Sequence, residues 1–125
     1  MQFKSSYHFK FEDLQIYQKA ILFGEYINKL TNKFPSHELY KLAGQFERAA
    51  DSIALNIAES YSGNDSNFNR YLIISQGSSN ECISCSTKAL LRKYISIEEN
   101  EEVRRQIAEI SKMNSSLRKR LIAKS

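Results

Sequence analysis

Residues 45–59 constrain the fold of this chain more than any other segment. Apolar residues recur through it at helical spacing, and four polar residues follow one another at steps of four, four and three: Arg48, Ser52, Asn56 and Glu59. Such steps align side chains along one side of a helix. A polar line that borders a core needs partners, because an unpaired buried amide or charge costs on the order of several kcal/mol. The segment therefore predicts a helix packed against other helices through a specified polar network.

The same helical spacing of apolar residues recurs elsewhere in the chain. Pro35 is the only proline and ends the first periodic segment, and Ser36 after it is a predicted N-cap of the second. Asp65 or Ser66 is a predicted cap of the third, and the acidic run 98–102 suits the first turns of a fourth, where the helix dipole favours carboxylates. Helices are predicted at about residues 12–33, 36–61, 66–94 and 98–122.

Three short connections join these four predicted helices, and short connections make sequential helices antiparallel. We therefore expect an all-α fold, an up-down-up-down four-helix bundle that forms a single domain over residues 11–125. Residues 1–10 are predicted to be an N-terminal arm, in which Phe3, Tyr7 and Phe9 alternate with polar residues. An apolar arm of this kind packs on the end of the bundle or on another subunit.

Three residues inside the predicted helices need a separate interpretation. Asn114 stands on the apolar seam of the fourth helix, where an amide can be buried and fix the register or lie hydrated at the edge. The sequence leaves both possibilities open. Cys82 and Cys85 lie three residues apart, but no second cysteine pair and no nearby histidine completes a metal site. We expect them to be buried thiols in a reducing compartment.

Composition and charge limit the class of protein. The 125 residues carry a formal net charge of +4, which permits contact with nucleic acid or an anionic membrane without requiring either. The start of the chain lacks the apolar core of a signal peptide, and no apolar run approaches the ~20 residues that cross a bilayer. We expect a cytoplasmic protein with no membrane partner.

The histidines argue against the catalytic sites that are known from helical bundles. A di-iron bundle needs Glu-x-x-His motifs, but Ser5 and Phe34 precede His8 and His37 at that offset. Bundle ribonucleases carry an Arg followed by a His, whereas both histidines here precede the first arginine, Arg48. Neither histidine is placed as a base for a Ser or Cys nucleophile. We expect no enzymatic activity, no cofactor, no metal and no small-molecule substrate.

The polar line is predicted to be a structural network, with a ligand site as the alternative. Adjacent antiparallel helices bring Arg48 towards Glu81 of the third helix, so we expect a partly buried ion pair between them. Buried ion pairs specify one arrangement rather than adding much stability. The predicted network comprises Arg48, Ser52, Asn56, Glu59, Ser78 and Glu81.

Basic residues are concentrated at the two ends of the chain and could contact phosphates. The alternative is a solvated helix end whose cations only match the helix dipole. No recognition-helix pattern or aromatic platform supports sequence-specific readout, so binding of RNA or DNA is expected to be salt-sensitive and poorly selective. The candidate contacts are Lys4, Lys10, Arg118, Lys119, Arg120 and Lys124.

Several apolar residues lie off the principal helical stripes, so some helices are apolar on two sides. A bundle with a second apolar face usually self-associates. We therefore expect a homo-oligomer. The off-stripe residues are Tyr26, Tyr40, Leu55, Tyr61 and Ile73.

A series of ordered motifs resembles one known family. The motifs are F-E-D-L at 11–14, I-Y-Q-K-A at 16–20, F-P-x-x-E-x-Y-x-L at 34–42, Q-x-x-R-A-A-x-S-I-x-x-N-I-A-E at 45–59, F-x-x-Y-L at 68–72 and G-S-x-x-E at 77–81. Together they resemble the 23S rRNA intervening-sequence proteins, also called the four-helix bundle protein family. The resemblance covers about residues 11–95, and the fourth helix is similar in pattern only.

The resemblance implies a left-handed antiparallel bundle that assembles as a homopentamer. Members were first noticed as reading frames inside intervening sequences of bacterial large-subunit rRNA genes, and none has an established catalytic activity. We expect a non-enzymatic, oligomeric binding or scaffolding module that contacts RNA. Related bundles are accessory proteins of diversity-generating retroelements and bind nucleic acid and a reverse transcriptase, which is the alternative role.

Two residues depart from the family pattern. Ser60 follows Glu59 where the family usually has glycine, so the second helix is expected to run further before it turns. Lys93 stands where the family tends to have glycine, at the end of the third helix. Neither departure touches the polar line, so the inference about the fold is unchanged.

Overall fold

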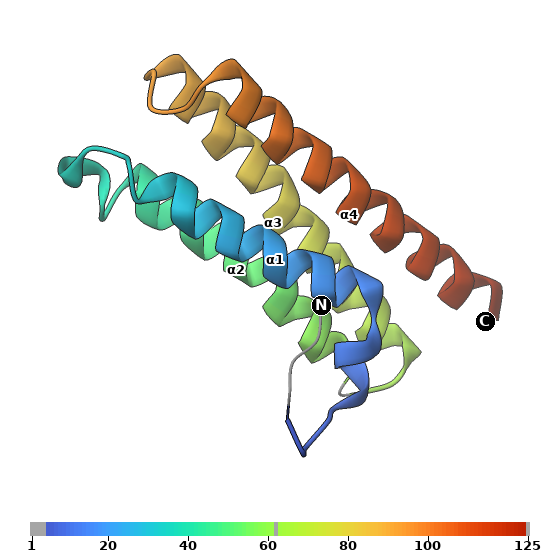
Figure 1. The fold of residues 1–125 in the computed structure, drawn as a ribbon. Coiled ribbons are helices and arrows are strands. Elements are labelled where there is room, and N and C mark those ends of the chain that lie inside the picture. Colours follow the sequence, from blue (N-terminus) through green and yellow to red (C-terminus); the bar gives the residue numbers. More distant parts are fainter. Residues whose placement is uncertain (1–4, 62, 125) are drawn as a thin grey trace.

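The chain is all-α in a computed structural model that describes residues 5–61 and 63–124, and the side chains of all of these except 123 and 124. Four long helices are present, as predicted, and the described residues contain no strand (Figure 1). The helices are α1 (Gln15–Thr31), α2 (Leu42–Ser60), α3 (Asp65–Leu91) and α4 (Ile97–Lys124). Two short 3-10 helices, η1 (Lys10–Asp13) and η2 (Ser36–Glu38), precede α1 and α2.

The chain turns back at each of the three connections, so each helix lies beside the next one along the sequence (Figure 1). The α2–α3 pair makes the most extensive contact, and α1 touches α4 far less than the other neighbouring pairs touch each other. The connection between α1 and α2 and the connection between α3 and α4 lie at the same end of the molecule (Figure 1). The handedness of the bundle stays a prediction.

The second helix differs from its predicted extent of 36–61. Ser36 is not an N-cap; it opens the single 3-10 turn η2, and α2 begins only at Leu42. The reason is the Glu38 carboxylate, which is buried and accepts a hydrogen bond from the Leu42 N–H at 3.4 Å. The backbone between these two residues turns so that the carboxylate reaches the start of α2.

The third and fourth helices begin with well-formed caps. The cap of α3 is Asn64, one residue before the predicted Asp65, and its side chain accepts from the Asn67 N–H at 3.0 Å. In α4 the Ser96 hydroxyl accepts from the Glu99 N–H at 3.0 Å, and the Glu99 carboxylate accepts from the Ser96 N–H at 2.8 Å. This reciprocal capping box places carboxylates in the first turn, as the acidic run predicted.

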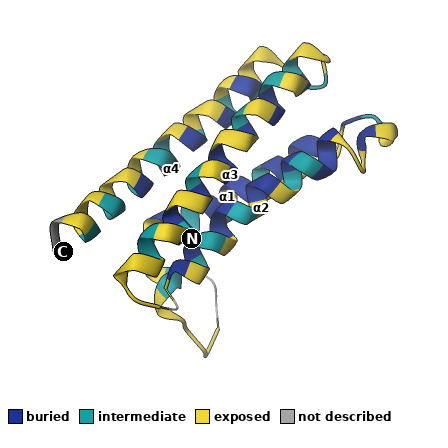
Figure 2. Cartoon of the chain, turned by 180° about the vertical axis from the view of Figure 1, so that it is seen from behind, coloured by how far each residue is buried: buried dark blue, intermediate teal, exposed yellow. Residues whose placement is uncertain are grey.

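The core is formed by the inward faces of all four helices, while their outward faces are exposed (Figure 2). Its largest fully buried apolar side chains are Phe23, Ile27, Phe46, Ile53, Ile57, Leu72, Val103 and Ile110. Helix α3 contributes mainly small buried residues, which lets α2 approach closely. Their hydroxyls find partners, since Ser75 donates to the Ile53 carbonyl at 3.1 Å and Ser86 donates to the Asn100 side-chain oxygen at 2.7 Å.

Asn114 is buried on the seam between α3 and α4, with 2% of its surface exposed. Its Nδ2 donates to the Leu72 carbonyl at 2.8 Å, whereas its Oδ1 has no hydrogen-bond partner in the described structure. The structure therefore favours the buried alternative over the hydrated edge. A single polar contact of this kind fixes one register of α4 against α3, at a cost in stability.

Lys93 occupies the left-handed position that ends α3. Its φ is 64°, and it is the one non-glycine residue with positive φ among the residues described. The Tyr94 N–H bonds to the Ala89 carbonyl at 2.9 Å and the Lys93 N–H bonds to the Leu90 carbonyl at 3.0 Å. This is a Schellman motif, whose left-handed residue is usually glycine because a Cβ is strained there. The departure from the family pattern therefore carries a backbone cost.

Replacing Lys93 by glycine is expected to stabilise the protein. Lys93→Gly removes the Cβ strain, and after the larger chain entropy of glycine is subtracted we expect a gain of about 0.5–1 kcal/mol in the free energy of unfolding. Urea unfolding measures it, with Lys93→Ala as the matched control that keeps the Cβ and stays near wild type. A lower stability for Lys93→Gly than for Lys93→Ala would contradict the assigned backbone conformation.

Candidate functional site

The predicted polar network lies between α2 and α3, and the structure brings three of its residues together. The Ser52 and Ser78 hydroxyls are 2.9 Å apart. The Asn56 Nδ2 donates to the Ser52 carbonyl at 2.8 Å and to its hydroxyl at 2.9 Å. All three side chains are only partly buried or at the edge of burial, so the network lies in the groove between the two helices.

The charged members of the predicted network are placed differently. Arg48 and Glu81 are exposed, and the structure, over the residues it describes, has no ion pair between them. Glu81 instead accepts from the Gln45 Nε2 at 3.5 Å. Glu59 is exposed near the end of α2. The expected Arg48–Glu81 pair is thus not formed, because the Arg48 guanidinium lies beside Gly44 and the Glu81 carboxylate lies beside Gln45.

A second polar cluster, centred on Glu38, was not predicted from the sequence. Glu38 is buried, with 5% of its side chain exposed. Its Oε2 accepts from the Arg92 Nη1 at 2.8 Å and from the Tyr94 hydroxyl at 2.8 Å, and its Oε1 accepts from the Leu42 N–H. This carboxylate therefore joins three places: η2, the start of α2 and the connection between α3 and α4.

The same end of the molecule is held by two further contacts between these connections. The rings of Phe34 and Tyr94 pack with their centroids 5.2 Å apart. Lys33 at the start of the first connection forms an ion pair with Glu99 in the first turn of α4. The sequence did signal this cluster, because Glu38 belongs to the F-P-x-x-E motif at 34–38. Helical periodicity alone gave no reason to expect a buried carboxylate there.

The surroundings of Glu38 favour its charged form. The hydrogen bond from Tyr94 lowers the pKa of the Glu38 carboxyl below its ordinary value of 4.5. Burial by itself raises this pKa, but the contacts with Leu42 and Arg92 lower it further, so the net shift is downward. A carboxyl whose pKa is lower in the folded than in the unfolded chain stabilises the fold above the unfolded pKa. That stability is lost as the pH falls through the folded pKa.

Removing the Glu38 charge is expected to lower the stability of the fold at neutral pH and to make that stability less dependent on pH in the acid range. Glu38→Gln keeps the shape but loses one charged acceptor, so we expect a melting temperature lower by more than about 5 °C at pH 7. The difference from wild type should shrink below pH 4.5, where wild type loses the same contribution.

Thermal melts at pH 7, 4.5 and 3 test this expectation. Glu101→Gln is the matched control, since Glu101 is exposed on α4 and takes part in none of the Glu38 contacts. An equal effect of both substitutions, or a difference from wild type that does not change with pH, would contradict the assigned role of Glu38.

The candidate nucleic-acid contacts are not brought into one cluster. Lys10 is exposed at the start of η1, and Lys119 and Arg120 are exposed near the end of α4. The Arg118 Nε donates to the Asn69 side-chain oxygen at 3.1 Å, so that guanidinium is partly committed to α3. Lys4 lies outside the described residues, and so does the side chain of Lys124.

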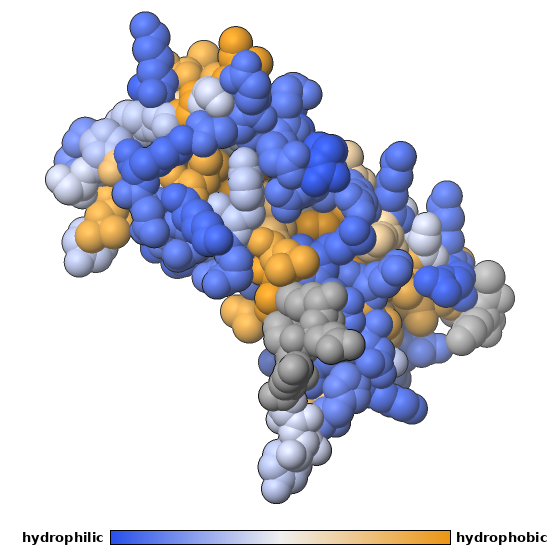
Figure 3. Space-filling view, in the orientation of Figure 1, coloured by the Kyte–Doolittle hydropathy of each residue, from blue (hydrophilic) through white to orange (hydrophobic). Residues whose placement is uncertain are grey.

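An open groove separates the start of α1 from the last turns of α4. Its volume is about 380 Å³, and its lining combines apolar side chains such as Leu14, Met113 and Leu117 with the charged Asp13 and Arg120. Hydrophobic side chains are visible among predominantly hydrophilic ones on the face that includes α1 and α4 (Figure 3). The groove follows from the limited contact between these two helices.

The two cysteines are reduced and deeply buried in α3. Burial raises the pKa of Cys85 to about 11 and raises the pKa of Cys82 further. Over residues 5–61 and 63–124, no group of three or more His, Cys, Asp or Glu side chains is arranged to hold a metal ion. Within the same residues, no helix has both the length and the apolar character that crossing a bilayer requires.

Both thiols are therefore expected to be unreactive in the folded protein. Because burial keeps them protonated and inaccessible, Ellman's reagent at pH 8 should label neither thiol of the native chain within minutes. Both should react at once in guanidinium chloride. Rapid labelling of one thiol per chain without denaturant would contradict the packing of α3.

These observations define the chain as an all-α protein of four helices, with polar contacts between α2 and α3 and a buried carboxylate that joins two connections. The sequence model of the 23S rRNA-intervening sequence protein family matches residues 12–116. This chain therefore belongs to that family. The resemblance of its motifs, noted from the sequence, is confirmed.

A solved structure has the same fold. It is a crystal structure of a protein of unknown function from the S23 ribosomal protein family of Bacteroides thetaiotaomicron, with a TM-score of 0.77 at 24% sequence identity. The similarity covers 83% of this chain and 95% of that one. At this identity it supports the fold alone. No curated protein matches this chain significantly.

Proposed function

We propose that this protein is a non-enzymatic, self-associating module, an antiparallel and left-handed four-helix bundle that binds or scaffolds nucleic acid. The observation that carries the proposal is the outward face of the α2–α3 pair, described below. The solved relative is itself described as a protein of unknown function.

The outward face of the α2–α3 pair combines exposed apolar side chains with small ones. Leu55 is 64% exposed on α2, and Ile73 and Ile74 are 46% and 41% exposed on α3. A Cβ at Gly77, one turn further along α3, would meet no atom within 4 Å, so the backbone there is open. Exposed apolar groups beside a bare backbone suit close contact with another protein surface.

Three polar side chains of this face already form hydrogen bonds within the chain. Ser52, Asn56 and Ser78 bond to one another, so a partner would not have to supply hydrogen bonds for them before burying them. The polar and small residues of this face, Ser52, Asn56, Gly77 and Ser78, belong to the motifs at 45–59 and 77–81, whereas its exposed apolar residues do not. A second copy of this chain is therefore the partner that we propose, and a closed ring such as a pentamer would use the face in a head-to-tail contact.

Light scattering coupled to size-exclusion chromatography tests the assembly. Wild type should elute as a multiple of the 14.5 kDa chain, with about five copies expected for the proposed ring. Leu55→Asp should shift the mass to that of the single chain, because a carboxylate buried in an apolar contact is costly.

Ile122→Asp is the matched control for this experiment. Ile122 is as exposed as Leu55 but lies at the end of α4 beside the first turns of α3, outside the patch of Leu55, Ile73 and Ile74, so the assembly should be unchanged. A wild-type mass of 14.5 kDa at about 100 μM would contradict self-association. An equal effect of both substitutions would contradict the assigned face.

Nucleic acid is the second partner that we propose, and RNA is the first candidate. The net charge of +4 and the cations near the end of α4 support phosphate contacts. Crosslinking followed by pull-down from the native cell identifies the bound species. If the bound nucleic acid is retained unchanged at several hundred millimolar salt, a mechanism based on phosphate contacts is contradicted.

A further inference from the structure

A basic cleft lies at the end of the molecule where Glu38 joins the two connections. Its volume is about 330 Å³, and residues of the η2–α2 corner and of the last turns of α3 line it. Four cations contribute to the lining: Lys41, Arg48, Lys88 and Arg92. None of them was among the nucleic-acid contacts predicted from the sequence, because they come from two separate segments of the chain that only the fold brings together.

The cleft retains most of its positive charge. Lys41, Arg48 and Lys88 form no ion pair or hydrogen bond through their side chains with any residue that the structure describes. By contrast, Lys19, Lys33 and Arg105 elsewhere on the surface each pair with a carboxylate. The buried Glu38 carboxylate lines the cleft but already accepts from Arg92, and the Glu81 carboxylate lies beside Gln45 at its edge. Like charges gathered in a concave site attract anions more strongly than the same charges spread over a surface.

The surroundings of two of the basic side chains show how they are placed in the cleft. Arg92 is fixed by its 2.8 Å hydrogen bond to Glu38. Arg48 lies over Gly44, since a Cβ there would be 3.2 Å from the Arg48 Nη1 and 2.8 Å from the Leu39 carbonyl oxygen. The absence of a side chain at Gly44 therefore makes room for the guanidinium at the wall of the cleft.

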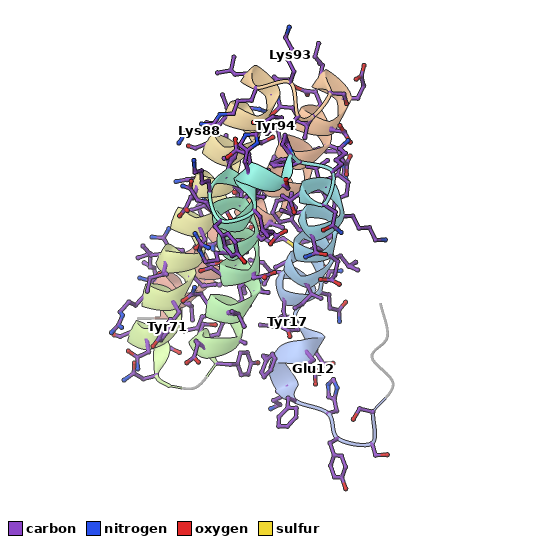
Figure 4. The ribbon with its side chains drawn as sticks, turned by 90° about the vertical axis from the view of Figure 1, so that its left-hand side faces the viewer. Glu12, Tyr17, Tyr71, Lys88, Lys93 and Tyr94 are labelled. Atoms are coloured by element: carbon purple, nitrogen blue, oxygen red, sulfur yellow. The ribbon has the colours of Figure 1, made fainter. Side chains whose placement is uncertain are left out.

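An exposed aromatic ring stands beside these cations. Tyr40 lines the cleft, yet 89% of its surface is exposed, and it forms no ring contact with any described residue. Lys88 and Tyr94 lie at the end of the bundle where η2 is found, with Lys93 pointing away from the bundle beyond them (Figure 4). A free tyrosine ring next to unpaired cations has the composition of a stacking platform for a base whose phosphate is bound close by.

We propose that this cleft binds single-stranded nucleic acid, with a phosphodiester held by Lys41, Arg48 and Lys88 and a base stacked on Tyr40. A single strand fits better than a duplex, because stacking on a side chain requires an unpaired base and the cleft has the volume of about one nucleotide. This inference rests on the proposed function, that the bundle binds nucleic acid, and it moves the main contact from the end of α4 to the opposite end of the molecule.

Fluorescence anisotropy with a labelled ten-nucleotide RNA tests the inference. The double variant Lys41→Gln, Lys88→Gln should bind more weakly and reduce the slope of log affinity against log salt by about 1.4, since each phosphate contact on a single strand contributes roughly 0.7. Tyr40→Ala should weaken binding roughly 5- to 150-fold and leave the salt slope unchanged.

The double variant Lys119→Gln, Arg120→Gln removes two of the α4 cations that the proposed function names, so it tests the competing location of the phosphate contacts. If the cleft carries the main contact, this variant should reduce the salt slope less than the cleft variant does. All the substituted side chains are exposed, so far-ultraviolet circular dichroism is expected to show unchanged folding. Parallel titrations with DNA of the same sequence and with a duplex RNA distinguish the kind of strand.

The possible results distinguish failure of the proposed cleft from failure of the proposed nucleic-acid binding. Normal binding by the cleft variants together with a reduced slope for the α4 variant would overturn the cleft and leave the proposed function standing. No binding of RNA or DNA by wild type would overturn both. Equal binding of duplex and single strand, with Tyr40→Ala unchanged, would overturn the stacking platform. Complete displacement of RNA by inorganic phosphate at constant ionic strength would show a small-anion site and would also overturn the inference.

Discussion

The buried carboxylate of Glu38 is the interaction on which the arrangement of this molecule most depends. Its oxygens accept from the start of α2, from Arg92 and from Tyr94, so one side chain links two connections that are more than fifty residues apart in the sequence. Because α1 and α4 touch little, the α1–α2 and α3–α4 halves are joined chiefly by the α2–α3 contact and by this end cluster. A charge that is withdrawn from water is tolerated only when its acceptor sites are filled, and here three donors fill them.

The Glu38 cluster also determines what the surface can present. It sets where α2 begins, and thereby where Arg48 and Lys41 stand relative to Lys88 on α3. The exposed apolar face of the α2–α3 pair lies further along the same two helices. The α2–α3 pair thus presents both the basic cleft at its end and the exposed apolar face along its side. This combination suits a protein that assembles with copies of itself while it holds a charged strand.

The sequence predicted the number of helices better than it predicted where the helices begin or where long side chains lie. The number of helices followed from apolar spacing, and the contacts among Ser52, Asn56 and Ser78 followed from steps of four on short side chains whose reach is small. The pairing of Arg48 with Glu81 failed, because periodicity gives the side of a helix but not how deeply a long, flexible side chain is buried. The η2 turn was not predicted, because residues 36–42 continue the helical pattern of the sequence. Only the contacts of the buried Glu38 carboxylate show why α2 begins at Leu42. The basic cleft was outside the reach of spacing arguments, because its cations come from separate segments.

The small residues of α3 have a consequence for the order in which the chain is built. On its own, a helix rich in serine and cysteine has little apolar surface to drive collapse and poor intrinsic helicity. The α1–α2 hairpin, with Phe23, Ile27, Phe46 and Ile53, leaves the ribosome first and carries the large apolar side chains. We expect that hairpin to serve as the template on which α3 becomes helical, with its serine hydroxyls meeting carbonyls such as that of Ile53 as it docks. In that view the small side chains of α3 keep this helix thin, so that α2 and α4 can both pack closely against it.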